Sequence, residues 1–329
     1  MFFFKWEDSI PKIMAGMLRL KIITVLSLVF VAMLGTAFAI NEKLRGKDMP
    51  TGKILTNEER AVVFGKATER PFSGKYDKFF DNGIYVCKVC GAPLYSSADK
   101  FDSGCGWPAF DDEFPNAVRK TPDADGERVE ILCSRCGAHL GHIFKGERLT
   151  KKNVRHCVNS LSMDFIQETD IGRAIVAGGC FWGVEELMRK QKGVLSCISG
   201  YTGGTSKNPT YAEVCRGNSG HYEAVEILFD KKLASYEEIL KYFFEIHDFT
   251  QRDGQGNDIG PQYESAVFYI GDSQKKTAEE IVKKLKNMGY DVATKILPAA
   301  EFFRAELKHQ RYCELNKKPP HCHVKRKVF

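Results

Sequence analysis

The 329-residue sequence predicts two domains of different fold class, a mainly β domain followed by an α/β domain. After Arg70 and Pro71, short apolar runs alternate with Gly-rich turns, as in all-β domains. The C-terminal half instead alternates strand-like and helix-like segments, the pattern of an α/β domain. The predicted boundaries are 1–39 for a signal peptide or membrane anchor, 40–53 for a linker, 54–168 for the β domain, 169–172 for a joint and 173–329 for the α/β domain.

The N-terminal segment has the composition of a targeting sequence. Residues 22–40 form an uncharged apolar run, and Lys and Arg residues precede it. The small residues Ala37 and Ala39 end the run, so we expect a signal peptide cleaved after Ala39. The alternative is an uncleaved membrane anchor, since about 19 apolar residues can just span a bilayer. Both interpretations predict an extracytoplasmic protein, either periplasmic or secreted, or tethered to a membrane.

The overall composition is that of a globular protein and argues against several functional classes. The formal charge of +6 is spread over the chain, with one basic run at residues 325–327, and does not predict nucleic-acid binding. We find no nucleotide or flavin motif, so no organic cofactor is expected. The sequence has eleven cysteines. In an oxidising compartment, the thiols that take part in chemistry would need an external supply of reductant.

The β domain is expected to begin with a helix and to bind zinc. Residues 57–66 are predicted to be helical, with Thr56 and Glu59 as a capping box. Further along, two C-x-x-C pairs are each followed by Gly, and four thiolates in such pairs suit a tetrahedral structural zinc. The alternative is a pair of disulfides or redox dithiols. The predicted ligands of this single zinc ion are Cys87, Cys90, Cys133 and Cys136.

A second group of residues in the β domain suggests catalysis. Alternation over residues 155–165 places Arg155, Cys157 and Asn159 on one face of a predicted strand. Arg155 would then favour the thiolate of Cys157. The segment GAHLGHIF (137–144) adds His139 and His142, and SGCGWP (103–108) adds Cys105 and Trp107. Either His alone is more often structural, but the combination favours a site.

These motifs, with ERPFSG (69–74), resemble methionine sulfoxide reductase B over residues 55–167. The resemblance implies that Cys157 is the nucleophile and Cys105 the resolving thiol, which predicts a disulfide between them. It further implies that Trp107 packs on the substrate methyl group. The remaining implied roles are orientation of the sulfoxide and its water by His139, His142 and Asn159, and tuning of the thiolate by Arg155.

The C-terminal half is organised around Cys180. An apolar run, 173–177, leads to Gly178 and Gly179, and a helical pattern follows Cys180, so the thiol is expected at a helix N-terminus. That position would lower the pKa of the thiol and make it a nucleophile. Phe181 and Trp182 would supply an apolar pocket. The alternative is a buried structural Cys, since free Cys is often buried.

We expect strands at 173–177, 195–199, 221–229 and 263–270, and helices at 181–190, 236–247 and 273–285. Ser235 and Glu238 form a predicted capping box. Glu223 lies among the apolar residues of one strand face, where burial would raise its pKa and suit a general acid. The alternative is a Glu at a strand end that reaches solvent. An apolar stripe on the last helix, Ala278, Ile281, Val282 and Leu285, is expected to be core.

Five motifs resemble peptide methionine sulfoxide reductase A over residues 173–329: GCFWG (179–183), GYTGG (200–204), NPTY (208–211), GHYEAV (220–225) and QGNDIGPQY (255–263). The resemblance implies a two-layer α/β sandwich with a mixed sheet. It implies that Glu223 acts on the sulfoxide oxygen and that Cys322 is the resolving thiol. The implied substrate-binding residues are Phe181, Trp182, Tyr211, Asp258 and Tyr263. Cys313 departs from the family pattern and is interpreted as packed, and Cys197 and Cys215 as structural.

Together the two resemblances imply a bifunctional reductase of methionine sulfoxide in proteins and as the free amino acid. The C-terminal domain would take the S epimer and the N-terminal domain the R epimer, through a Cys sulfenic acid and then a disulfide. An external thioredoxin-like protein would supply the electrons. The alternatives are a zinc-knuckle binding module fused to a thiol–disulfide oxidoreductase, and a zinc hydrolase. Four protein ligands on zinc disfavour the hydrolase, because they leave no open position.

Overall fold

The computed structural model describes residues 54–123, 125–320 and 323–329. The predicted signal peptide, the linker and Cys322 therefore lie outside the described residues. Residues 56–329 form one compact unit. Within the described residues, no helix has both the length and the apolar composition needed to cross a membrane.

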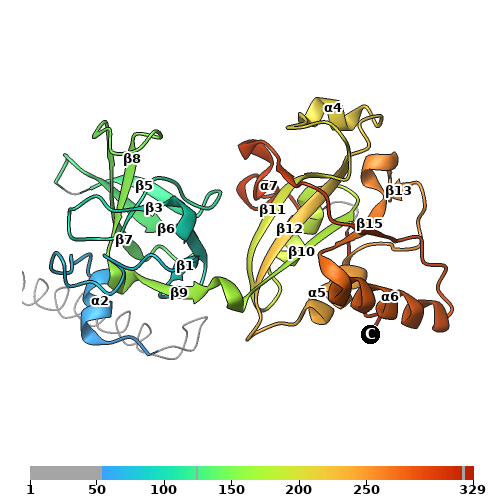
Figure 1. Ribbon diagram of the computed structural model, residues 1–329, viewed down its shortest axis with the longest axis horizontal. Coiled ribbons are helices and arrows are strands. Elements are labelled where there is room, and N and C mark those ends of the chain that lie inside the picture. Colours follow the sequence, from blue (N-terminus) through green and yellow to red (C-terminus); the bar gives the residue numbers. More distant parts are fainter. Residues whose placement is uncertain (1–53, 124, 321–322) are drawn as a thin grey trace, which may run out of the picture. The chain divides into compact units, whose positions relative to one another are not determined.

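The N-terminal half is mainly β, as predicted (Figure 1). One antiparallel sheet has the order β2-β1-β9, formed by Pro93–Ser96, Gly83–Cys87 and Met163–Gln167. The second has the order β3-β4-β8-β7-β6-β5 and is also antiparallel. Its strands are Lys100–Phe101, Ala109–Phe110, Val154–Val158, His139–Lys145, Val129–Cys133 and Val118–Pro122. Short 3-10 turns lie at Ser97–Asp99 and Ser160–Ser162.

Helix α2, Asn57–Val63, opens this half with the predicted capping box. The Thr56 hydroxyl accepts the N–H of Glu59 at 3.1 Å, and the Glu59 carboxylate accepts the N–H of Thr56 at 2.8 Å. The helix ends three residues before the predicted Lys66. Lys66 has a φ of 59°, a left-handed conformation that a helix cannot continue through.

The prediction of one continuous strand over residues 155–165 is wrong. Strand β8 ends at Val158, and the turn at Ser160–Ser162 separates it from β9. The buried carboxylate of Glu69 explains the break, because it accepts the N–H groups of Ser160 and Leu161 at 2.6 and 3.1 Å. Residues 155 and 157 still share one face of β8, opposite Phe144 and His142 of β7.

The C-terminal half is α/β with a six-stranded mixed sheet, in the order β16-β15-β10-β12-β11-β17. Its strands are Lys295–Pro298, Ser265–Tyr269, Ile171–Gly178, Tyr222–Asp230, Val194–Thr202 and Phe303–Arg304. Only the β15–β16 pair among these described strands is parallel. The helices are α3 Phe181–Met188, α4 Tyr211–Cys215, α5 Tyr236–Ile246, α6 Gly271–Asn287 and α7 Tyr312–Leu315, with β13 Gly254–Gln255 pairing β14 Asp258–Ile259. Short 3-10 turns lie at Glu168–Asp170, Pro261–Tyr263 and Leu307–His309.

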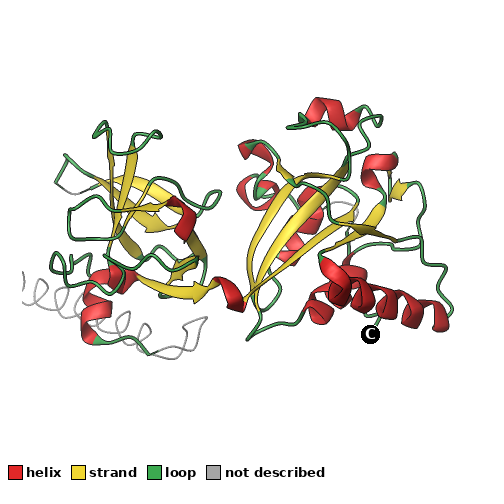
Figure 2. Ribbon diagram, viewed as in Figure 1, coloured by secondary structure: helices red, strands yellow, loops and turns green. Residues whose placement is uncertain are grey.

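The main core of this half lies between one face of the sheet and helices α3, α5 and α6 (Figure 2). Ala174 and Val176 of β10 face this core, while Ile175 and Ala177 face a smaller cluster on the opposite side. The predicted strands and helices all exist with shifts at their ends; residue 263 lies in a 3-10 turn rather than in β15. The capping box of Ser235 and Glu238 and the buried stripe on α6 are confirmed.

Candidate active sites

The first site lies where β7 and β8 pair in the N-terminal half. Cys157 of β8 is directly opposite His142 of β7, a register that brings the two predicted residues together. Both line a cavity of about 110 Å³. The other residues of its wall are Thr68, Trp107, Arg128, Gly141, Phe144, Val158 and Asn159. The cavity is small and mostly apolar, so it suits a side chain with a single polar group.

Cys105 and Cys157, 52 residues apart in sequence, have sulfur atoms 3.9 Å apart. The predicted pair of nucleophilic and resolving thiols is therefore assembled before any disulfide forms. Arg155 forms a bidentate ion pair with Glu147, at 2.7 and 2.8 Å. Its guanidinium lies 4.4 Å from the ring centre of Phe144. Its Nη1 donates to the sulfur of Cys105 at 3.4 Å.

Arg155 lowers the pKa of Cys157, as expected, but the thiolate is not favoured overall in the free protein. The hydrogen bond with Cys105 and burial raise the pKa of Cys157, and they outweigh the opposing effect of Arg155. The same hydrogen bond, helped by Ser103 and Arg155 and opposed by burial, lowers the pKa of Cys105 to about 5. The two thiols therefore titrate as one coupled pair.

Each His of this site is held by a carboxylate that sequence reasoning missed. His139 Nδ1 lies 2.7 Å from Glu130, and Glu130 also binds Lys66 at 2.7 Å. Burial lowers the pKa of His139, so the imidazole is neutral, and its buried Nε2 has no hydrogen-bond partner among the described residues. His142 Nε2 lies 2.7 Å from Asp123. With Nδ1 carrying a proton toward Glu130, Nε2 of His139 is left as an acceptor.

Asn159 and Trp107 are fixed through the segment at Glu69. The Asn159 amide donates to the carbonyl of Leu140 at 3.0 Å and accepts the N–H of Glu69 at 3.0 Å. One N–H of this amide is therefore left for a ligand. The indole of Trp107 donates to the carbonyl of Glu69 at 3.1 Å, which leaves the ring face available to line the cavity.

The four predicted metal ligands are assembled in the turns after β1 and β6. The sulfur atoms of Cys87, Cys90, Cys133 and Cys136 all lie within 4.8 Å of one another. Two of the separations, Cys87–Cys136 and Cys90–Cys133, are 3.7 Å. A tetrahedron with Zn–S bonds of about 2.3 Å has sulfur separations of about 3.8 Å, so the cluster matches zinc geometry.

The second site begins at Cys180, the N-cap residue of α3 and the end of the turn after β10. Gly179 has a φ of 92°, and a Cβ there would lie 2.4 Å from the side chain of Gln255, so only Gly fits. The predicted strand–turn–helix geometry is present. The expected low pKa is not: burial raises the pKa of Cys180, and the carboxyl of Glu223 raises it further. The short helix does not offset the loss of solvation.

Glu223 of β12 lies beside this turn and is 1% exposed. Its Oε2 accepts the backbone N–H of Phe181 at 3.1 Å, while its buried Oε1 has no hydrogen-bond partner among the described residues. Burial raises the pKa of Glu223 to about 8, as its position among apolar residues predicted. The carboxyl is therefore protonated at neutral pH and can donate a proton.

Aromatic rings form the wall next to Cys180. Phe181 stacks with Tyr211 at 6.4 Å between ring centres, and Trp182 stacks on Tyr312 at 3.8 Å. The indole of Trp182 donates to His309 Nδ1 at 3.1 Å, and the His309 ring lies 4.5 Å from that of Tyr211. Sequence reasoning missed His309, because nothing local links it to a residue 127 positions away.

Tyr263 and Asp258 complete the predicted set at the turn Pro261–Tyr263 and on β14. Burial raises the pKa of Tyr263, with Glu223 adding to the effect, so the phenol stays protonated. Asp258 lies close enough to raise the pKa of both Cys180 and Glu223. The structure thus brings the predicted residues of the second site together, Cys322 excepted.

Comparisons with known proteins match the two halves separately. The family model "Peptide methionine sulfoxide reductase" matches residues 172–329, and "SelR domain" matches residues 55–167. The chain is 49% identical over 147 residues to peptide methionine sulfoxide reductase MsrA of Nocardia farcinica, covering 44% of this chain and 84% of that protein. It is 54% identical over 113 residues to peptide methionine sulfoxide reductase B5 of Oryza sativa, covering 34% and 83%.

The chain belongs to the peptide methionine sulfoxide reductases. An MsrB half precedes an MsrA half in one polypeptide, as the sequence predicted. It is also similar to a crystal structure of Mxr1 from Saccharomyces cerevisiae in reduced form, at 30% identity and a TM-score of 0.46, over 49% of this chain and 95% of that one.

The other thiols of the MsrA half lie in different environments. Cys313 is 5% exposed, and its thiol donates to the carbonyl of Trp182 at 3.5 Å, in agreement with the packed interpretation. Cys197 is buried, whereas Cys215 at the end of α4 is exposed and hydrogen-bonds with Tyr211. Burial therefore agrees with a structural role for Cys197, while that of Cys215 stays a prediction.

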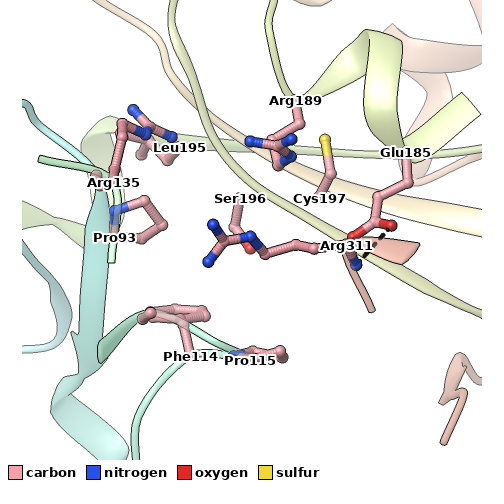
Figure 3. A pocket seen from close by; sticks show the side chains of 12 residues that line it. Pro93, Phe114, Pro115, Arg135, Glu185, Arg189, Leu195, Ser196, Cys197 and Arg311 are labelled. Carbon is pink, nitrogen blue, oxygen red and sulfur yellow. Dashed lines mark hydrogen bonds between the residues drawn. The ribbon is translucent and has the colours of Figure 1, made fainter. Parts of the chain in front are cut away.

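A second small cavity, of about 50 Å³, is lined by none of the residues of the two candidate active sites (Figure 3). Figure 3 shows the guanidinium groups of Arg135, Arg189 and Arg311 around it. The buried carboxyl of Glu185 accepts the backbone N–H of Arg311 with both oxygens at 2.9 Å. Burial raises the pKa of Glu185 to about 7. The cavity has room for one or two water molecules and serves packing.

Proposed function

We propose that both halves turn over methionine sulfoxide, the MsrB half acting on the R epimer and the MsrA half on the S epimer. The single observation that carries this proposal is the presence of two separate thiol sites with different proton donors. The sulfur of a sulfoxide is a stereocentre, and one chiral pocket cannot align both epimers for attack. Two sites explain why the chain has two halves.

In the MsrA half, the thiolate of Cys180 attacks the sulfoxide sulfur while Glu223 protonates the oxygen. The free Oε1 of Glu223 is the group available for that proton transfer, since Oε2 is held by Phe181. Methionine leaves, and the Cys180 sulfur becomes a sulfenic acid. Because burial raises the pKa of Cys180, substrate binding must supply the activation that the free site lacks.

In the MsrB half, Cys157 carries out the same attack and Cys105 resolves the sulfenic acid. The sulfurs are 3.9 Å apart, so a shift of about 2 Å is enough to form a bond of about 2.05 Å. His142 lines the cavity, and the ring of His139, whose Nε2 has no partner among the described residues, lies 5.6 Å from that of His142. The two rings would hold the water or the sulfoxide oxygen.

Zinc is proposed as a structural ion of the MsrB half, held by the four-cysteine cluster. Zinc would tie the turn after β1 to the turn after β6 and so join the two sheets of this half. Four thiolates fill the tetrahedron, so the ion would contribute stability and no chemistry.

The partners follow from the chemistry. Each disulfide formed in turnover needs two electrons, and we propose an external thioredoxin-like dithiol protein as their source. The proposed substrates are oxidised methionines in proteins and free methionine sulfoxide. The N-terminal segment supports an extracytoplasmic location, either through a cleaved signal peptide or as an anchor; N-terminal sequencing of the protein from its native host distinguishes the two.

The test is turnover of the separated epimers with dithiothreitol by wild type, Cys157→Ser and Cys180→Ser. Each variant is the matched control of the other, because each leaves one site intact. We expect Cys157→Ser to lose the R epimer only and Cys180→Ser the S epimer only. No reduction of either epimer by wild type would refute the proposal and favour a general thiol–disulfide oxidoreductase.

A further inference from the structure

The sulfur of the resolving Cys105 accepts hydrogen bonds from side chains on two segments of the MsrB half. The hydroxyl of Ser103 donates to it at 3.0 Å, and Nη1 of Arg155 at 3.4 Å. Cys157 lies 3.9 Å away and can donate its own proton. The fourth neighbour is the carbonyl of Trp107 at 3.6 Å, an acceptor for the Cys105 proton when that thiol is protonated. Three of these four groups stabilise a thiolate.

The donor Arg155 is itself fixed. Glu147 holds its Nε and Nη2, so Nη1 is the nitrogen aimed at the sulfur. Ser103 lies two residues before Cys105 in the same loop, where its hydroxyl reaches the sulfur without any movement of the backbone. The arrangement serves Cys105 in the reduced protein, before any substrate is bound.

We propose that Ser103 is a catalytic residue of the resolving step, in which it and Arg155 hold Cys105 as the thiolate that attacks the sulfenic acid of Cys157. The proposal rests on the proposed function of the MsrB half. It gives Arg155 a part in the second chemical step, in addition to its lowering of the pKa of the nucleophile Cys157. The low pKa of Cys105, about 5, agrees with this assignment.

The step balances as follows. The first reaction has transferred two electrons from the Cys157 sulfur to the sulfoxide, giving methionine and a sulfenic acid. The Cys105 thiolate then attacks the Cys157 sulfur, the S–O bond breaks, and the S–S bond forms. The hydroxide that leaves takes a proton from solvent and becomes water.

Several charged groups face Cys105. Arg155 and Lys78 are the cations near it, and each is paired with a carboxylate, Glu147 and Asp102 respectively. Cys157 is the titratable group in contact with it. The pKa of each carboxyl is lowered by its cation, so both ion pairs stay charged at neutral pH. His142 faces Cys157 from the paired strand β7.

A donor that stabilises a thiolate also makes it a weaker nucleophile, so the expected effect depends on pH. Removal of the Ser103 hydroxyl raises the apparent pKa of Cys105 by about one unit, which leaves about tenfold less thiolate below that pKa. The rate of disulfide formation falls at acid pH, and this acid limb of the pH–rate profile should lie about one pH unit higher in Ser103→Ala than in wild type. Near pH 8 the rate should be equal to that of wild type or slightly higher.

The experiment uses the full chain with Cys180→Ser, so that only the MsrB half reacts. The protein is mixed rapidly with the R epimer without reductant between pH 5 and 8 and quenched in acid. Methionine formed reports the first step, and loss of two thiols reports the disulfide. Ser103→Thr keeps the hydroxyl and should show the wild-type pH dependence of disulfide formation. Ser73→Ala, which changes another serine of the same half, is the matched control.

A shift of the acid limb for disulfide formation alone supports the proposal. A shift for methionine formation, or for neither step, overturns it. A second readout does not need turnover: alkylation by iodoacetamide at pH 5, mapped by mass spectrometry. Cys105 should react faster than Cys157, and Ser103→Ala should slow Cys105 by several-fold; the reverse order overturns the proposal. If wild type forms no methionine, the proposed function fails, while alkylation still decides the role of Ser103.

Discussion

The backbone N–H of Phe181 donates to Oε2 of Glu223 at 3.1 Å, while Oε1 of the same carboxyl is buried without a partner among the described residues. One oxygen therefore fixes the carboxyl against the first residue of α3, next to Cys180. The other oxygen is left for substrate. An orphaned polar atom at a buried position costs stability, and at a catalytic site it marks the place that the ligand completes.

The first prediction concerns the activity of Glu223→Gln. Gln keeps the hydrogen bond from Phe181 but cannot deliver a proton, so S-epimer turnover should fall by about 10²–10⁴. R-epimer turnover by the same protein is the internal control and should not change. In wild type, kcat/KM for the S epimer should fall as pH rises through about 8, where Glu223 loses its proton. Equal losses with both epimers would contradict this role.

The second prediction concerns the stability of the same variant. The folded protein holds the Glu223 proton up to about pH 8, while the unfolded chain releases it near 4.5. Wild-type stability must therefore decrease as pH rises between these values. Gln has no such proton, so Glu223→Gln should be more stable than wild type above pH 8, by on the order of 5 kcal/mol.

Chemical unfolding of both proteins from pH 4 to 9 checks this difference. The two free energies should approach each other at the acid end and separate as the pH rises. A difference that does not depend on pH would mean that Glu223 is not a buried acid in the folded protein.

The third prediction concerns zinc. Cys136 is the exposed member of the cluster, so Cys136→Ser removes one ligand with little loss of packing. We expect zinc content to fall from about one ion per chain, and the unfolding temperature of the MsrB half to fall by at least about 10 °C. R-epimer turnover should be lost at a lower temperature than S-epimer turnover.

Cys157→Ser is the matched control for zinc content, because this cysteine lies in the same half but outside the cluster. Elemental analysis of both variants measures the zinc content per chain. Unchanged metal content in Cys136→Ser would argue that the four thiols bind no zinc.

Features encoded by neighbouring residues could be predicted from the sequence. The capping boxes of Thr56 with Glu59 and of Ser235 with Glu238 span three residues and depend on nothing distant. The turn at Gly179 and the exposure pattern of the strand that carries Glu223 are local in the same sense. Secondary structure, the fold class and the positions of the nucleophiles follow from such signals.

Features that depend on tertiary contacts could not be predicted. Glu130 reaches His139 through the hairpin of β6 and β7, whose register has a bulge that the sequence does not reveal. The capping carboxylate of Glu69, 91 residues before Ser160, ends a strand that alternation had extended. The sequence did not reveal that burial raises the pKa of Cys180, nor that a hydrogen bond with Cys105 raises the pKa of Cys157 against the effect of Arg155.

The last prediction concerns His309 in the MsrA half. This ring accepts the indole N–H of Trp182 and lies against Tyr211, so it fixes two walls of the substrate pocket at once. Burial lowers the pKa of His309, which keeps Nδ1 free to accept at neutral pH. His309→Ala leaves the indole N–H without its acceptor, and we expect KM for the S epimer to rise about tenfold, with a smaller change in kcat. His309→Asn retains an acceptor oxygen and should recover part of the affinity. A fall in kcat at unchanged KM would instead place His309 in the chemical step rather than in positioning the pocket.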